Sequence, residues 1–213
     1  MGYPTLEYSR TEVDAAGEAL VIYPDNEYPT EKALRVISNF RSAHGRPLNT
    51  MTVGLRRRCI GVASNYLVAQ RVKRLSSIVA KMRRFQGLRL SQMQDIGGCR
   101  AVLSSVAEVR NAVKSFKTSS IRHELAREDD YIANPKDSGY RGVHLIYKYV
   151  SDRSETYNGL KIEVQIRSQL QHAWATAVET VGTFIQQALK SSQGEDEWLR
   201  FFCLMGSAIA LRE

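Results

Sequence analysis

The segment from Lys161 to Arg167 alternates strictly between branched apolar residues and polar ones. Because successive side chains of a β-strand point to opposite faces of the sheet, this period of two predicts a strand with one buried and one polar face. Glu163, Gln165 and Arg167 then lie on the polar face. An ordinary solvent-facing sheet surface also explains one such strand, so the pattern alone does not identify a site.

Helical and strand patterns surround this segment in a clear order. Helices are expected over 31–44, 53–70, 76–85, 106–116, 169–189 and 197–211, where apolar residues recur at helical intervals. Besides the alternating segment, read as a strand over 160–166, strands are expected over 99–103 and 142–150, with Gly97 and Gly98 as the bend before the first of these two. Start and stop signals bound the first helix, with Pro29 and Thr30 before it and Gly45 and Pro47 ending it. Helices, then strands interleaved with helices, then helices predict an α+β (α/β) domain with a mixed β-sheet flanked by helices.

Charge and cysteine content narrow the class of partner and compartment. A formal net charge of +8 and a pI of about 9.5 favour nucleotides, phosphates or RNA, and neither a membrane nor DNA is expected as a partner. Three cysteines at unrelated spacings suggest neither disulfides nor a zinc site, which fits a reducing cytoplasm. The N-terminal residues lack the apolar stretch of a signal peptide. The chain is therefore expected to be a cytoplasmic protein.

Two segments away from the alternating strand carry polar groups suited to chemistry. Asp95 precedes a glycine pair, which would bring a carboxylate to the mouth of a strand, although a turn-capping aspartate is an alternative. The segment 130–144 joins turn residues to Lys136, Tyr140, Arg141 and His144. Such a loop offers cationic donors for phosphate and an aromatic ring for a base.

A third segment is basic. Arg71, Lys73 and Lys81 lie within or near a short helix that also carries Ser77. They form a plausible phosphate clamp, although a solvated charged surface is the usual meaning of such a run. The chain has no GxxxxGK[ST] loop, so nucleotide binding would depend on these side chains.

Read in order, these motifs resemble the Rel/SpoT-type alarmone synthetases over about residues 70–179. The residues that carry the resemblance are Arg71-x-Lys73, Ser77-Ile78, Lys81-Met82, Asp95-Ile96-x-Gly98-x-Arg100, Asn134-Pro135-Lys136, Gly139-Tyr140-Arg141, His144 and Glu163-x-Gln165-Ile166-Arg167. The resemblance implies a nucleotidyltransferase-like fold and an ATP-dependent pyrophosphokinase that transfers pyrophosphate to a ribose 3′-hydroxyl. Gly142-Val143 stands where these enzymes often carry Ser-Leu, and no His-Asp pair of the family's hydrolase domain occurs, which indicates a small synthetase-only form.

The resemblance also implies a role for each residue. Arg71 and Arg100 would enclose the adenine of ATP, and Lys73, Ser77 and Lys81 would hold its phosphates. Asp95 and Glu163 would be the catalytic carboxylates that bind Mg²⁺, and Glu163 would also accept the hydroxyl proton. On the acceptor side Tyr140 would stack on the base, and the remaining residues would contact phosphates or support the acidic centre. These are Lys136, Arg141 and His144 for phosphate, and Gln165 and Arg167 for support.

The identity of the acceptor remains open. Alarmone-making relatives use GDP or GTP, and the adenine-nucleotide product (p)ppApp is a further alternative, whereas toxic members modify the 3′-terminal adenosine of tRNA. The segment Glu7-Tyr8-Ser9 and the tail with Trp174, Trp198 and Phe201-Phe202 are more similar to the toxic, phage-associated branch, which implies a tRNA acceptor and an antitoxin protein or domain. Basic clusters support RNA contact, although scattered surface charge explains them equally well. They are Arg56-Arg57-Arg58, Arg83-Arg84 with Arg89, and Lys114, Lys117 and Arg122. An inactive nucleotide- or RNA-binding module is a further alternative, opposed by the presence of both carboxylates.

The expected organisation has three parts. Residues 1–58 form a helical extension, 59–190 the synthetase domain, and 191–213 a C-terminal helix that packs on the core or on an antitoxin.

Overall fold

The computed structural model describes residues 2–22, 31–189 and 192–213. Its α-helices are α1 (Arg10–Ile22), α2 (Glu31–Ala43), α3 (Gly45–Ile60), α4 (Leu75–Arg84), α5 (Val106–Thr118), α6 (Gln169–Phe184) and α7 (Asp196–Arg212). Its strands are β1 (Tyr66–Val72), β2 (Gly97–Leu103), β3 (Glu124–Asp130), β4 (Val143–Lys148) and β5 (Lys161–Ser168), and short 3₁₀ turns occur at η1 (Leu90–Gln92) and η2 (Glu155–Tyr157).

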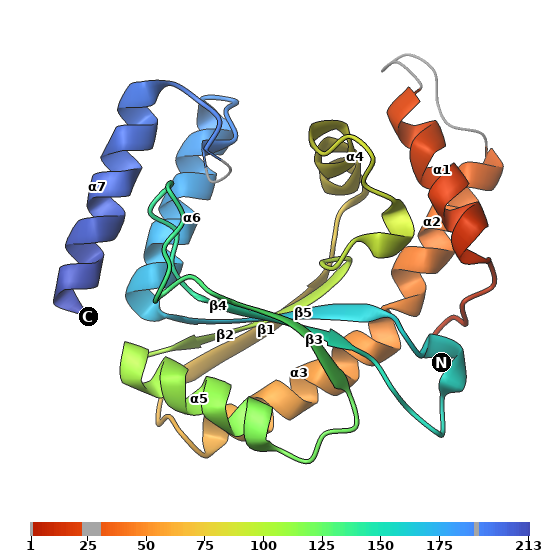
Figure 1. Ribbon diagram of the computed structural model, residues 1–213, viewed down its shortest axis with the longest axis horizontal. Coiled ribbons are helices and arrows are strands. Elements are labelled where there is room, and N and C mark those ends of the chain that lie inside the picture. Colours follow the sequence, from red (N-terminus) through yellow and green to blue (C-terminus); the bar gives the residue numbers. More distant parts are fainter. Residues whose placement is uncertain (1, 23–30, 190–191) are drawn as a thin grey trace.

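The strands form one sheet in the order β1-β2-β5-β4-β3. β2 and β5 run parallel, whereas β1–β2, β5–β4 and β4–β3 are antiparallel pairs. Helices flank this sheet on both sides (Figure 1). The expected α+β fold with a mixed sheet between helices is therefore confirmed.

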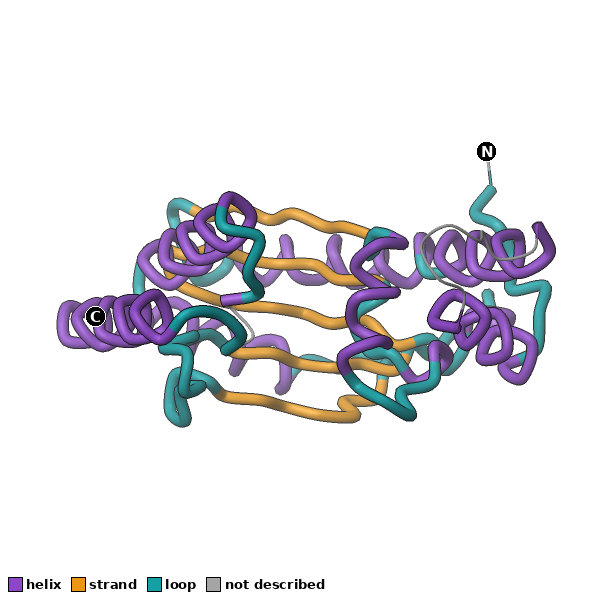
Figure 2. Tube along the Cα trace, turned by 90° about the horizontal axis from the view of Figure 1, so that it is seen from above, coloured by secondary structure: helices purple, strands orange, loops and turns teal. Residues whose placement is uncertain are grey.

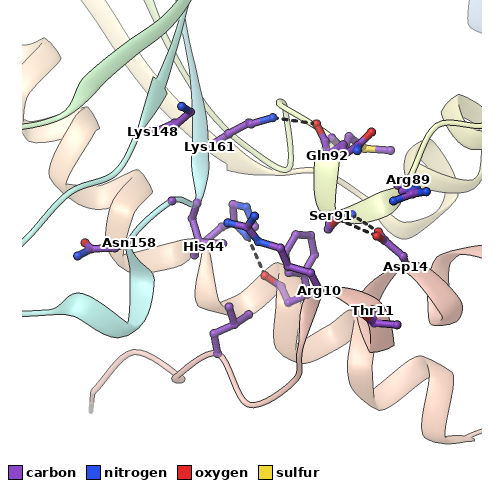
Figure 3. A pocket seen from close by; sticks show the side chains of 15 residues that line it. Arg10, Thr11, Asp14, His44, Arg89, Ser91, Gln92, Lys148, Asn158 and Lys161 are labelled. Carbon is purple, nitrogen blue, oxygen red and sulfur yellow. Dashed lines mark hydrogen bonds between the residues drawn. The ribbon is translucent and has the colours of Figure 1, made fainter.

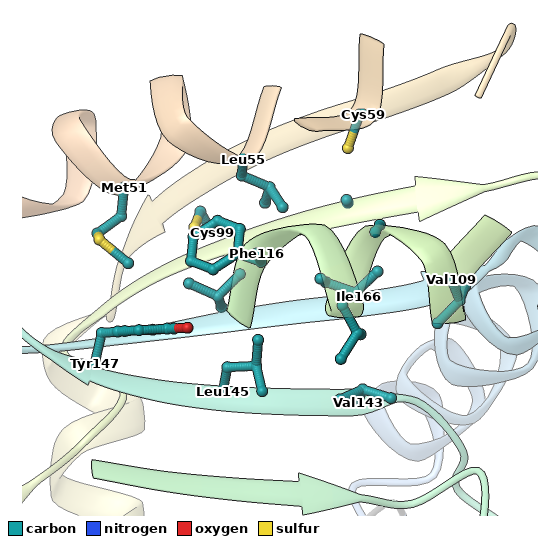
Figure 4. Close-up of a cluster of buried hydrophobic side chains, with 14 of the residues drawn as sticks. Met51, Leu55, Cys59, Cys99, Val109, Phe116, Val143, Leu145, Tyr147 and Ile166 are labelled. Atoms are coloured by element: carbon teal, nitrogen blue, oxygen red, sulfur yellow. The ribbon is translucent and has the colours of Figure 1, made fainter. Parts of the chain in front are cut away.

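One face of the sheet is the apolar one, and α3 and α5 cover it (Figure 4). The inward residues of β5 are Ile162, Val164 and Ile166, which are 0% exposed. Leu55 of α3 and Phe116 of α5 pack in the same cluster. Burying a large aliphatic or aromatic side chain contributes about 1.5–3 kcal/mol, so this layer anchors the sheet and forces the alternate residues onto the other face.

The opposite face lies between two groups of helices (Figure 1) (Figure 2). α1, α2 and α4 stand at one end and share a hydrophobic cluster that includes Ile37, Phe40 and Ile78. α6 and α7 stand at the other end, where Trp174 donates its indole N–H to the Phe202 carbonyl at 2.8 Å. The polar face of the sheet is therefore the surface that lies between these two groups of helices.

Three details of the expected secondary structure were wrong. A helix over 53–70 is replaced by the end of α3, a turn and β1, because Gly61 stops the helix and 66–72 pairs with β2. Pro47 does not end a helix but lies in the first turn of α3, where its missing N–H costs nothing. Gly97 and Gly98 belong to β2 and form no bend, and a Cβ on Gly97 would come within 2.7 Å of Ile162 Cδ1.

Three elements had no counterpart among the expected ones: α1, β1 and β3. β3 has the sequence ELAREDD, and its charged residues do not alternate with apolar ones, so the pattern that predicts a strand is absent. The proposed division at residue 58 stays a prediction, although α3 packs under the sheet as part of its core. Pro29, Thr30 and the boundary at 190–191 lie outside the described residues. Within the described ranges, no helix is both long and apolar enough to cross a membrane.

Candidate active site

The strand register gathers the expected site residues on the polar face. Across the central strands, Gly98 pairs with Glu163 and Arg100 with Gln165. Arg71 of β1 pairs with Gly98, and His144 of β4 pairs with Gln165. Laterally paired residues share a face, so residues from four strands lie on the face of the sheet that is between the helix groups.

A chain of hydrogen bonds holds Glu163. One carboxylate oxygen lies 3.0 Å from His144 Nδ1, and the other accepts from Gln165 Nε2 at 2.6 Å. Arg167, which is 1% exposed, donates to Gln165 Oε1. Burial raises the pKa of Glu163, but the hydrogen bonds from His144 and Gln165 outweigh it and lower that pKa to about 2. Glu163 is therefore an ionised, oriented carboxylate.

Asp95 lies just before β2 between two lysines. Lys73 Nζ donates to one oxygen at 2.9 Å and Lys81 Nζ to the other at 2.8 Å. The Lys73 backbone N–H also donates to the Ile96 carbonyl at 2.8 Å, which fixes the end of β1 beside Asp95. Burial raises the pKa of Asp95, yet the two ammonium groups outweigh this and hold it below its ordinary value.

The carboxylates of Asp95 and Glu163 are chemically suited to bind a divalent cation. The Lys81 ammonium lowers the pKa of both Asp95 and Glu163, so both carboxylates lie in the field of one charge. Mg²⁺ commonly takes one or two carboxylates together with water and substrate phosphates. No cluster of three or more His, Cys, Asp or Glu suited to a metal occurs in the described part of the chain. Each carboxylate oxygen already accepts one hydrogen bond and keeps a further lone pair for a cation.

Tyr140 does not present an open ring in this structure. It is 3% exposed, its hydroxyl lies 2.5 Å from His144 Nε2, and its ring meets Trp174 edge-on. The ring is covered because α6 and α7 pack on the preceding turn, and its expected stacking on a base stays a prediction. Stacking on Tyr140 would require movement of these side chains.

Lys136 and Tyr131 lie next to this ring. Lys136 Nζ is 4.4 Å from the centroid of the Tyr131 ring and 5.5 Å from that of Tyr140. Tyr131 is half-buried and its ring meets both Tyr140 and His144 edge-on. The structure thus keeps Lys136 and His144 in one group.

The other expected residues lie on α4, on β1 and β2, and in the loop before β4. Arg141 donates to the Ile132 carbonyl at 3.1 Å and lines a small recess beside Trp174 and Gly206. Ser77 is exposed on α4, one turn before Lys81. Arg71 is exposed and Arg100 half-buried, on adjacent strands. Burial lowers the pKa of Arg100, and the nearby positive charges of Arg167 and Arg71 lower it further.

Sequence reasoning missed a charged pair on the same face. Asp129 of β3 pairs with His144, and Arg127 donates to its carboxylate at 2.9 and 2.8 Å. Tyr131 is the first residue after the end of β3. The sequence feature that could have indicated this pair is its position just before the loop that carries Lys136. The pair was missed because β3 was not predicted to be a strand.

The basic clusters divide between the two faces. The clusters on α3 and α5 lie on the apolar side of the sheet, which these two helices cover and which is opposite the carboxylates. Lys117 pairs with Glu128 and Arg122 with Asp152, so their charge is locally balanced. Arg83, Arg84 and Arg89 belong to the α4 region on the polar side.

Comparison with known proteins identifies the family. The model for "Region found in RelA / SpoT proteins" matches residues 70–183. GTP pyrophosphokinase YwaC of Bacillus subtilis is 32% identical over 115 residues, which are 50% of this chain and 52% of that protein. GTP pyrophosphokinase YjbM of the same organism is 34% identical over 112 residues, or 51% and 52% of the two chains. The chain spans about half the length of these curated relatives.

Solved structures share the fold over a larger part of the chain. Small alarmone synthetase 1 of Bacillus subtilis bound to its product pppGpp superposes with a TM-score of 0.70 at 23% identity, covering 84% of this chain and 93% of that one. A GTP pyrophosphokinase family protein from Streptococcus pneumoniae gives 0.68 at 24% identity, covering 82% and 88%. At these identities the likeness concerns the fold, whereas the family model spans more than half of the sequence. The chain belongs to the RelA/SpoT family.

Proposed function

We propose that this protein is a pyrophosphokinase that moves the β,γ-pyrophosphate of ATP to the 3′-hydroxyl of a ribose. The observation that carries the proposal is the pair of ionised carboxylates, Asp95 and Glu163, on a face that also holds Lys73, Lys81 and His144. The relatives named GTP pyrophosphokinase support the same reaction type.

The proposed step is a displacement at the β-phosphorus. The 3′-oxygen forms a bond to that phosphorus, the bond from it to the oxygen bridging to the α-phosphate breaks, and AMP leaves with the electron pair. Mg²⁺ held by Asp95 and Glu163 would neutralise charge on the transferred phosphates. Lys73 and Lys81, which pair with Asp95 in this structure, would bind those phosphates.

The fate of the hydroxyl proton depends on the basicity of Glu163. A pKa of about 2 keeps this carboxylate free to accept a proton but makes it a weak base. His144, Gln165 and Arg167 fix its direction. This arrangement supports the cation-binding role of Glu163 more strongly than its role as a general base, so the 3′-hydroxyl proton would pass to solvent water as the bond to phosphorus forms.

The test is a transfer assay with a matched control. Purified protein receives γ-labelled ATP with Mg²⁺ and, separately, GDP, GTP, ATP or deacylated tRNA as acceptor. Wild-type protein is expected to label an acceptor, and Glu163→Gln to lose at least about a hundredfold of that rate because the face loses an anionic ligand. Glu31→Gln, on an exposed and distant carboxylate, should be unaffected. Full activity of Glu163→Gln would remove the basis of the proposal.

For the acceptor we propose the 3′-terminal adenosine of tRNA, which would make the protein an inhibitor of translation. Support comes from the likeness of the N-terminal segment and C-terminal tail to toxic members and from Arg83, Arg84 and Arg89 on the polar side. Counterion release makes an RNA reaction fall steeply with salt, so a rise from 50 to 200 mM should reduce tRNA labelling at least about tenfold. A tRNA reaction insensitive to salt would oppose this choice.

A guanine nucleotide is the second candidate acceptor. It is favoured by the names of YwaC and YjbM and by the fold shared with a synthetase bound to pppGpp. In this case GDP or GTP alone acquires label, with weak dependence on salt. The clusters on α3 and α5 lie on the far side of the sheet, so they add no support to RNA binding at the active face.

An antitoxin, as a separate protein or a further domain, belongs to the same proposal. α7 packs Phe202 inward at 5% exposed, whereas Phe201, Leu204 and Leu211 are 49%, 60% and 92% exposed. The packing of Phe202 agrees with an intramolecular role, and the exposed side is the surface on which such a partner would bind. Co-expression with a neutralising protein should protect these residues from hydrogen exchange.

A further inference from the structure

A cavity of about 590 Å³ lies outside the residues to which the family resemblance gives a role, and of the basic residues linked above to RNA it includes Arg89 (Figure 3). Its walls come from the N-terminal segment and α1, the ends of α2 and η1, and the hairpin that joins β4 to β5. Small-molecule sites commonly measure about 300–1,000 Å³, so the space suits a ligand of nucleotide size. None of its lining residues belongs to the set that the family resemblance assigns.

The charge around the cavity is positive. Arg10, Arg89, Lys148 and Lys161 line it, against the single lining carboxylate of Asp14. Asp14 is engaged by Ser91, whose N–H and hydroxyl donate to it at 2.8 and 3.0 Å. These contacts connect α1 to η1, so Asp14 has a structural role in the wall of the cavity.

The cations are largely available. Lys148 pairs with Glu124 at 2.8 Å, whereas Lys161 donates only to the Gln92 carbonyl, at 3.5 Å. Within the described ranges, no carboxylate forms an ion pair with Arg10 or Arg89. Converging cations from three parts of the chain provide an anion site that needs no helix terminus or glycine loop.

The remaining lining is apolar or neutral. Leu6, Phe40, Met93 and Leu160 supply apolar surface. His44 is 1% exposed, and burial lowers its pKa to about 4, so it adds no charge near neutral pH. A ligand that fits both parts carries phosphate at one end and a less polar group, such as a base and sugar, at the other.

We propose that this cavity is a second nucleotide site, which binds the phosphates of a nucleoside phosphate through Arg10, Arg89, Lys148 and Lys161. Its position is adjacent to the active face, because Lys161 precedes Glu163 by two residues on the same strand and face. The site is independent of the transfer reaction and stands even if that reaction has a different acceptor.

The test counts bound nucleotides by isothermal titration calorimetry. An ATP analogue with a methylene bridge between the α- and β-phosphates, and GDP, are titrated separately into wild-type protein. With at least one of them two equivalents should bind. In Arg89→Ala/Lys161→Ala the affinity of one equivalent should fall more than about tenfold while the other is retained.

A steric variant guards against a purely structural effect. Thr11 is an exposed residue of α1 that lines the cavity, so Thr11→Trp should fill the space without removing charge and should also lose one equivalent. Arg56→Ala/Arg57→Ala, on the exposed side of α3, should keep both. Inorganic triphosphate, titrated in parallel, should occupy the site more weakly because it lacks the nucleoside.

The outcomes are decisive. One equivalent in wild-type protein that both cavity variants retain, or two unchanged equivalents in both cavity variants, overturns the second site. Equal binding of inorganic triphosphate and nucleotide overturns the role of the apolar wall. Failure of pyrophosphate transfer is a separate result, because the titration requires no reaction.

Discussion

The contact between α7 and the turn before Tyr140 can be tested with one methyl group. A Cβ on Gly206 would lie 2.6 Å from the Gly139 carbonyl oxygen and 3.0 Å from its Cα. Gly139 has a φ of +86°, and its own Cβ would lie 3.0 Å from the Phe202 oxygen. The helix and the turn therefore approach backbone to backbone, with no flexible side chain to yield.

The expected cost of Gly206→Ala follows from two opposing effects. Alanine in a helix interior gains up to about 1 kcal/mol over glycine. Overpacking against rigid atoms costs about 1–3 kcal/mol. Because both nearest atoms belong to the backbone, the second effect should prevail, and the free energy of unfolding should fall by about 1–2 kcal/mol.

A second helical glycine provides the control. At Gly54 in α3 a Cβ would meet only Arg58 Nη1, at 3.3 Å, the far end of a flexible side chain. Gly54→Ala should therefore stabilise the protein by up to about 1 kcal/mol. Urea unfolding followed by circular dichroism measures both, and acrylamide quenching of Trp174 and Trp198 should increase in Gly206→Ala as α7 moves away. Stabilisation of both variants would refute the close contact and, with it, the reason why Tyr140 is covered.

Two further predictions concern titratable groups. Burial lowers the pKa of His44 to about 4, against the opposing hydrogen bond to the Phe40 carbonyl, and the unfolded chain takes up the proton first. The free energy of unfolding should thus fall by about 2 kcal/mol between pH 7 and pH 5, and His44→Gln should lose this component, as urea curves at the two pH values would reveal. Burial also raises the pKa of Cys59 to about 11 and of Cys99 to about 12, so iodoacetamide at pH 8 should alkylate the half-buried Cys203 first. Mass spectrometry of the peptides checks the order, and early labelling of Cys99 would contradict it.

Sequence patterns predicted the elements that have one apolar and one polar face. β5 alternates strictly, and its burial follows the same alternation up to Ile166. β3 escaped because an edge strand of charged residues carries no buried stripe. β1 escaped because its apolar residues continue the preceding helical pattern, and only pairing with β2 separates the two.

Sequence motifs predicted which residues form the candidate site, but not how those residues contact one another. Motif order named Glu163, Asp95 and His144, which the register places on or beside one face. Local sequence could not show that α6 and α7 cover Tyr140, since Phe202 and Gly206 lie more than sixty residues later in the chain. The cavity beside Lys161 likewise depends on α1 and η1, which come together only in the folded molecule.

The strand order has a consequence for the way the protein is made. β5 is the last strand in the chain, yet it occupies the middle of the sheet, between β2 and β4. A growing chain that ends before Lys161 therefore lacks both Glu163 and the central strand of the sheet. β2 and β4 have no shared partner strand until β5 has been made. Such non-local pairing slows folding, because distant segments must be ordered before their contacts form. Catalytic competence should consequently appear in one late step, so that an incomplete chain is inert rather than partly active.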